Sequence, residues 1–63
     1  MERKTAIDLM RIDIKCAEMI LAEQKAIRDN YEYGSICYGT YNANVARLEG
    51  KIAAWKEAID LLA

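Results

Sequence analysis

Between residues 38 and 62 the large apolar side chains recur at alternating steps of three and four. They are Tyr38, Tyr41, Val45, Leu48, Ile52, Trp55, Ile59 and Leu62. This period places all of them on one side of an α-helix, as in the seam of a coiled coil. We therefore predict a helix over 39–62 with at least one further helix packed lengthwise against it.

The partner helix is expected upstream, because the chain from 6 to 30 contains neither glycine nor proline and is rich in good helix formers. Thr5-Ala6-Ile7-Asp8 has the spacing of a capping box, in which a hydroxyl and a carboxylate three residues later bind the first free amides of a helix. We therefore predict an all-α fold over 1–63, a single domain made of an antiparallel two-helix hairpin with helices at 5–30 and 39–62.

The first predicted helix is apolar around more than half of its circumference, in two adjacent seams. One seam comprises Ile7, Met10, Ile14, Ala17 and Leu21. The second comprises Leu9, Ile12, Cys16, Met19, Ile20 and Ile27. One partner helix cannot cover both, and apolar surface left in water costs roughly 25 cal/mol per Å². The sequence thus predicts a homo-oligomer, with a dimeric four-helix bundle favoured, whose interface is the second seam. Trp55 is a candidate anchor of the same interface, although its place in the seam of the second helix favours a core residue.

The connection between the predicted helices is rich in tyrosine, glycine, serine and asparagine. Its tyrosines are Tyr31, Tyr33, Tyr38 and Tyr41. Tyrosine offers a large, stiff contact area at low entropic cost, and this composition is typical of recognition loops. We predict that the four rings bind a partner. The alternative, favoured for Tyr38 and Tyr41 because they continue the seam, is that the rings close the end of the bundle.

Several local features of the connection and of the second helix have alternative interpretations. Gly34 and Gly39, in the connection, can supply positive φ at a helix end and in a turn, which favours a simple reversal of the chain. A short tyrosine-rich β-hairpin is the alternative structure for this connection. Either Ser35 or Thr40 can cap the second helix. Gly50, inside that helix, costs about 1 kcal/mol relative to alanine, which suggests that another segment approaches closely there.

The two cysteines are predicted to differ in exposure. Cys16 is predicted to be buried and Cys37 to be more accessible, and in one hairpin they are too far apart to form a disulfide.

The composition excludes several functional classes. Nine basic and ten acidic residues give no basic excess, which disfavours nucleic acid as a partner. Charges interrupt the apolar N-terminal segment, so we expect neither a signal sequence nor a membrane span, and a cytoplasmic protein with reduced thiols. Two cysteines without histidine cannot supply a familiar zinc site, and no catalytic motif or cofactor motif is present. We expect no metal, no cofactor and no enzymatic activity.

Five polar residues remain as candidates for specific roles. Asp13 and Glu23 lie within the apolar arc of the first helix. A catalytic pair is the less favoured interpretation; more often such acids fix the register of an oligomer, and either could accept a hydrogen bond from the indole of Trp55. Asn44, Arg47 and Lys51 form a compact basic patch that could bind an anion such as a nucleotide phosphate, although a solvated helix face is the simpler explanation.

The length and two-helix plan resemble Rop-type hairpins, which dimerise into four-helix bundles. No residue motif is shared, so the similarity concerns architecture alone, and the RNA binding that it implies is the weakest functional alternative. We favour a small non-enzymatic interaction protein that binds or blocks another protein, of the accessory or inhibitory kind common in phages and other mobile elements. The main alternative is an oligomer that sequesters a small anionic ligand at its subunit interfaces.

Overall fold

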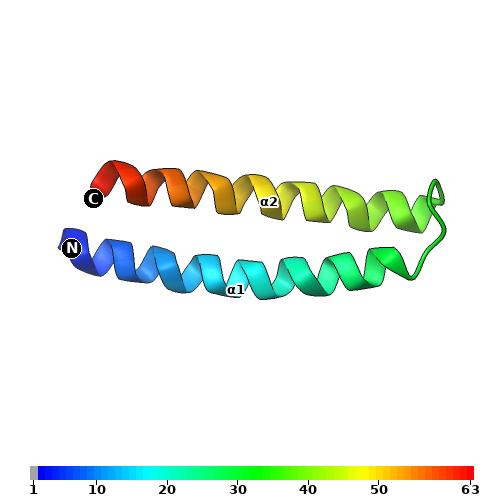
Figure 1. Ribbon diagram of the computed structural model, residues 1–63, viewed down its shortest axis with the longest axis horizontal. Helices are drawn as coiled ribbons and strands as arrows, with labels where there is room; N and C mark the ends of the chain where they lie inside the picture. The colour runs from blue at the N-terminus through cyan, green and yellow to red at the C-terminus, as the bar shows by residue number, and fades with distance from the viewer. Residues whose placement is uncertain (1) are drawn as a thin grey trace.

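The structure, a computed structural model that describes residues 2–63, consists of two α-helices joined by a short turn at 30–35. Helix α1 spans Arg3–Asp29 and helix α2 spans Ile36–Leu62. The helices lie side by side and antiparallel, so that the start of α1 is next to the end of α2 (Figure 1). No strand occurs within residues 2–63. The predicted all-α hairpin is therefore confirmed, and the β-hairpin alternative for the turn is wrong.

Helix α1 begins before the predicted capping box. Its N-cap is Glu2, whose side chain makes no capping hydrogen bond, and the Glu2 carbonyl accepts the amide of Ala6 at 3.0 Å. Thr5 thus lies inside the helix, and the capping-box prediction is wrong. Arginine and lysine at the first two helical positions have high helix propensity, which allows the first turn to form without a side-chain cap.

The turn ends in a glycine and a serine that set the start of α2. Gly34 has a φ of +88°, in the left-handed region that glycine adopts without steric cost. The Ser35 hydroxyl oxygen accepts a hydrogen bond from the amide of Tyr38 at 3.1 Å, which makes Ser35 the N-cap. Thr40 already lies in the helix and donates its hydroxyl to the Ile36 carbonyl at 3.0 Å. Of the two predicted caps, Ser35 is confirmed and Thr40 is wrong.

The core is one narrow seam between the helices. Its buried side chains are Ile14, Ala17, Val45 and Ile52. Leu21, Trp55 and Ile59 are half-buried and pack against the cluster of Ile14, Ala17 and Ile52. All eight residues of the predicted α2 seam and all five of the first α1 seam are buried or half-buried, so both seams are confirmed.

A hydrogen bond between two amide side chains shows how the helices are aligned. The Asn44 amide donates to the side-chain oxygen of Gln24 at 3.2 Å. Counting from this pair along the antiparallel helices places Lys51 level with Ala17, which agrees with the packing of Ala17 against the neighbouring Ile52. The same count places Trp55 level with Asp13.

Cys16, which is predicted to be buried, and Gly50, where the sequence suggests a close approach, are both open to solvent in the single chain. Cys16 is exposed, as is Cys37, because α2 covers only the arc of α1 that contains Ile14 and Ala17. The prediction of a buried Cys16 is therefore wrong for one hairpin. A Cβ built on Gly50 would meet nothing within 4 Å, so α1 makes no close approach there. Within residues 2–63, neither helix has an apolar stretch sufficient to cross a bilayer.

Candidate interaction surfaces

Two helices lying side by side leave two long faces uncovered, and these differ in composition. We call one the apolar face; its exposed residues are Leu9, Ile12, Asp13, Cys16, Met19, Ile20 and Glu23 of α1 and Arg47 and Lys51 of α2. We call the other the ion-paired face; its residues are Asp8, Arg11, Glu18, Lys25 and Asp29 of α1 and Glu49 and Lys56 of α2.

The apolar face exposes large aliphatic side chains of α1 to water. Leu9 is 46% exposed, Ile12 58%, Met19 69% and Ile20 47%. Burying one such side chain completely contributes about 1.5–3 kcal/mol, so the uncovered set is unfavourable in an isolated chain. The structure thus places five of the six residues of the second seam on the surface, whereas Ile27 is half-buried and Trp55 lies against the core.

A shallow groove runs between the two helices on the apolar face. It has a volume of about 330 Å³ and is lined by Ile20, Gln24, Asn44, Arg47, Leu48 and Lys51. The three residues predicted to bind an anion are therefore adjacent in the structure. Asn44 is already bonded to Gln24, and the Lys51 ammonium lies 5.2 Å from the centre of the Trp55 ring. The groove shows that Ile20 and the basic patch share one face.

The ion-paired face pairs several of its charges within the chain. Lys25 lies 4.0 Å from Glu49 across the two helices, and Arg11 lies 4.0 Å from Asp8 along α1. Arg28, at the edge of this face, donates a hydrogen bond to Asp29 at 3.0 Å, which raises the pKa of Arg28. Exposed pairs of this kind each contribute about 0–1 kcal/mol. This face has the properties of a surface that water covers.

The four tyrosines pair with one another at the turn. Tyr31 stacks on Tyr41, with ring centres 5.8 Å apart and an interplanar angle of 8°. Tyr33 meets Tyr38 edge to face, with ring centres 5.2 Å apart, and the Arg28 guanidinium lies 5.6 Å from the centre of the Tyr38 ring. Each turn tyrosine thus packs against a tyrosine of α2. Tyr33 nevertheless remains 85% exposed.

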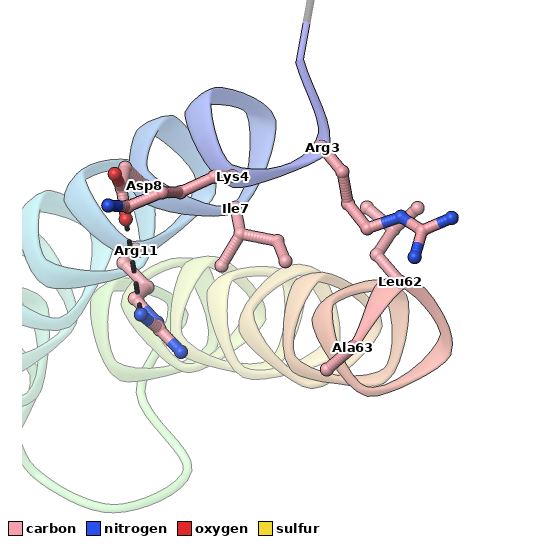
Figure 2. Close-up of a pocket in the computed structure, with 7 residues that line it drawn as sticks. All are labelled: Arg3, Lys4, Ile7, Asp8, Arg11, Leu62 and Ala63. Carbon is pink, nitrogen blue, oxygen red and sulfur yellow. Dashed lines mark ion pairs between the residues drawn. The ribbon is translucent and has the colours of Figure 1, made fainter.

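The open end of the hairpin has a hollow that the sequence did not indicate. Its volume is about 400 Å³. Its lining residues are labelled in Figure 2 and are Arg3, Lys4, Ile7, Asp8, Arg11, Leu62 and Ala63. The Ile7 side chain points toward α2, while Arg11 is paired with Asp8 (Figure 2). Nothing in the spacing of these residues predicts the hollow, because it forms only where the first turns of α1 meet the last residues of α2.

The two acids of the apolar face are not arranged as a catalytic pair. Asp13 and Glu23 lie ten residues apart on one helix, about 15 Å along its axis. No hydrogen bond joins the Trp55 indole to either acid within residues 2–63. Among the same residues there is no group of three side chains able to hold a metal ion.

Comparison of the chain with protein-family models, with curated proteins and with solved structures finds no match. The function is therefore inferred from the residues of the hairpin and their geometry.

Proposed function

We propose that this chain is a non-enzymatic interaction protein, which self-associates through its apolar face into a dimeric four-helix bundle and binds and blocks another protein through its tyrosine-rich turn. The observation that carries the proposal is the exposure of Leu9, Ile12, Met19 and Ile20 along one side of α1. Contiguous exposed apolar surface on a small protein is typical of an interaction site.

The surface area supports self-association quantitatively. A compact monomer of 7.2 kDa has an accessible surface of about 4,100 Å², whereas this hairpin has 4818 Å². The excess is about 700 Å² per chain, close to the roughly 800 Å² that each partner buries in a stable protein interface. One copy of the same face would therefore cover the surplus surface.

The tyrosine pairs support the recognition role of the turn. Rings that already stack on one another lose little conformational freedom when a partner binds, and tyrosine is enriched among residues that dominate binding energy. Tyr33 and Tyr31 are exposed, and their partners Tyr38 and Tyr41 hold them in place. The turn thus presents exposed tyrosine rings, held by contacts with other rings, at one end of the helical hairpin.

Light scattering coupled to size-exclusion chromatography tests the self-association. We expect twice the chain mass of 7.2 kDa at micromolar concentration, with helical circular dichroism. A folded species with the mass of one chain would contradict the proposal. The recognition role is tested on a purified binary complex, in which Tyr33→Ala should weaken binding at least tenfold while Lys56→Ala, on the ion-paired face, leaves it unchanged.

Anion sequestration is the second candidate, and the groove that brings Asn44, Arg47 and Lys51 together is the observation that favours it. A ligand whose free concentration is about 100 times its Kd raises the apparent free energy of unfolding by roughly 2.7 kcal/mol. Thermal unfolding with inorganic phosphate and with nucleotides tests this candidate. A shift that Arg47→Ala abolishes would support it, and the absence of a shift with every anion would count against it.

A further inference from the structure

The charges of the apolar face are segregated between the two helices. Helix α1 contributes the acids Asp13 and Glu23, and α2 contributes the bases Arg47 and Lys51. All four side chains are exposed, and within residues 2–63 none of them forms an ion pair. On the ion-paired face, in contrast, each helix carries both signs. The apolar face is therefore complementary to a surface that presents its bases opposite α1 and its acids opposite α2.

A second copy of the hairpin can present such a surface in only one of two symmetric arrangements. When two equal layers stack face to face, the two-fold axis lies in the interface, either parallel or perpendicular to the helices. A parallel axis places α1 on α2 of the second copy, with both turns at the same end. A perpendicular axis places each helix on its own equivalent, with the turns at opposite ends.

The parallel axis brings unlike charges together. Rotation about this axis does not change the position of a residue along the helix axis, so the two copies cannot slide relative to one another. Lys51 is level with Ala17, so Lys51 of the second copy lies four residues, about 6 Å along the axis, from Asp13. By the same count, Arg47 of the second copy lies two residues, about 3 Å, from Glu23. Packed helices are about 8–10 Å apart, within reach of these long side chains.

The perpendicular axis brings like charges together. When the hairpins overlap over nearly their full length, Asp13 faces Glu23 of the second copy, and Arg47 comes within about two residues, roughly 3 Å, of facing Lys51 of the second copy. Sliding the hairpins to separate these charges would expose part of the apolar surface again. Repulsion between like charges in a partly desolvated interface disfavours this arrangement.

We infer that two copies of this chain pack head to head about a two-fold axis parallel to the helices, an inference that rests on the proposed self-association. The apolar contacts agree with it, since Leu9 then meets the small side chain of Ala58 of the second copy. The four tyrosines of each copy lie at the same end and together form one symmetric aromatic surface. A protein partner therefore meets both turns at once, and Arg47 and Lys51 are occupied by carboxylates instead of an anionic ligand.

The native cysteines provide the decisive measurement. Cys37 is exposed at the turn end of α2, and Cys16→Ser leaves it as the single labelling site. With a spin label on Cys37, pulsed electron paramagnetic resonance should give a distance of about 20 Å, because the two labels lie diagonally across one end of the bundle. A perpendicular axis would separate the labels by nearly the hairpin length of 46 Å.

The possible outcomes distinguish the head-to-head orientation from the self-association on which it rests. A distance near the hairpin length would overturn the head-to-head orientation and leave self-association intact. The absence of any distance between copies, together with the mass of one chain, would overturn the self-association itself.

A charge exchange gives an independent test in the unlabelled protein. Asp13→Lys and Lys51→Asp should each weaken the dimer about tenfold, and together they should restore it to within about threefold, because the pair is reversed. Glu18→Lys, on the ion-paired face of the same helix, should leave the dimer unchanged. With a perpendicular axis Asp13→Lys would instead face Glu23 of the second copy and strengthen the dimer, which would overturn the inference.

Discussion

The two long faces of this hairpin carry the same kinds of charged residue and use them differently. On the ion-paired face, Lys25 meets Glu49 and Arg11 meets Asp8 within one chain. On the apolar face, acids and bases are separated by helix and lie beside aliphatic side chains that nothing in the hairpin covers. The difference suggests that a face whose charges are partly paired within the chain is exposed to water, whereas a face that combines exposed aliphatic side chains with charges that form no ion pair within residues 2–63 contacts another surface.

The largest expected effect comes from placing a charge in the middle of the apolar face. Ile20→Glu should weaken the dimer at least 100-fold, because each copy would lose the burial of a large aliphatic side chain and the interface would have to desolvate an added carboxylate. Sedimentation equilibrium measures the dissociation constant. Ala22→Glu is the matched control, since Ala22 is exposed on the same helix but lies outside the apolar face, and it should change nothing. Equal behaviour of the two variants would mean that the faces do not differ as proposed.

Next in size is the loss of a core side chain that supports both faces. Ile52→Ala should lower the free energy of unfolding by about 2–4 kcal/mol, since Ile52 is 7% exposed and packs against Ile14 and Ala17. Urea denaturation measures this change. The same substitution at Ile36, which is 90% exposed, is the control and should cost much less. Similar losses at the two positions would contradict the single narrow core.

A smaller effect is expected from breaking an ion pair on the ion-paired face. Lys25→Ala should lower the free energy of unfolding by less than about 1 kcal/mol, because both partners are substantially exposed and the pair is screened by salt. The dimer dissociation constant should not change. In Lys51→Ala, by comparison, the dimer dissociation constant should rise several-fold. A larger rise in Lys25→Ala than in Lys51→Ala would contradict the distinction between the two faces.

The smallest effect on stability is expected at the turn, which belongs to neither face. Tyr33→Ala should lower the free energy of unfolding by about 0.5 kcal/mol, because it removes the edge-to-face contact with Tyr38 but almost no buried area, the ring being 85% exposed. Tyr41→Ala should cost more, since Tyr41 is half-buried and its removal loses buried area in addition to the stacked ring pair with Tyr31. Thermal unfolding compares the two. Equal losses would show that Tyr33 is a structural residue and would weaken its assignment to recognition.

Much of the fold could be predicted because its determinants are local. The three-four spacing from Tyr38 to Leu62 identifies α2 and its packing side, and Ser35 is a recognisable N-cap. The start of α1 could not be predicted from its apparent capping box, because the propensity of the preceding residues extends the helix past Thr5. The exposure of Cys16 could not be predicted for another reason: a broad apolar arc does not reveal which part of it one partner helix covers.

The candidate surfaces were predictable as residue sets but not as arrangements. The sequence distinguished two adjacent seams on α1 and a basic patch on α2, yet no local pattern shows that Ile20 and Lys51 line one groove. The pairing of each turn tyrosine with a tyrosine of α2 likewise depends on how closely the turn folds back.

The sequence by itself determined that this chain forms two amphipathic helices with more apolar surface than one hairpin can bury, because helix periodicity and composition are properties of short segments. Only the tertiary structure decided which seam of α1 the second helix covers and which charges share the remaining face. The physical reason is the antiparallel alignment of the helices: their rotation and register bring distant residues to the same side and the same level. Within residues 2–63 they leave four charged residues without an ion-pair partner, namely Asp13 and Glu23 of α1 and Arg47 and Lys51 of α2.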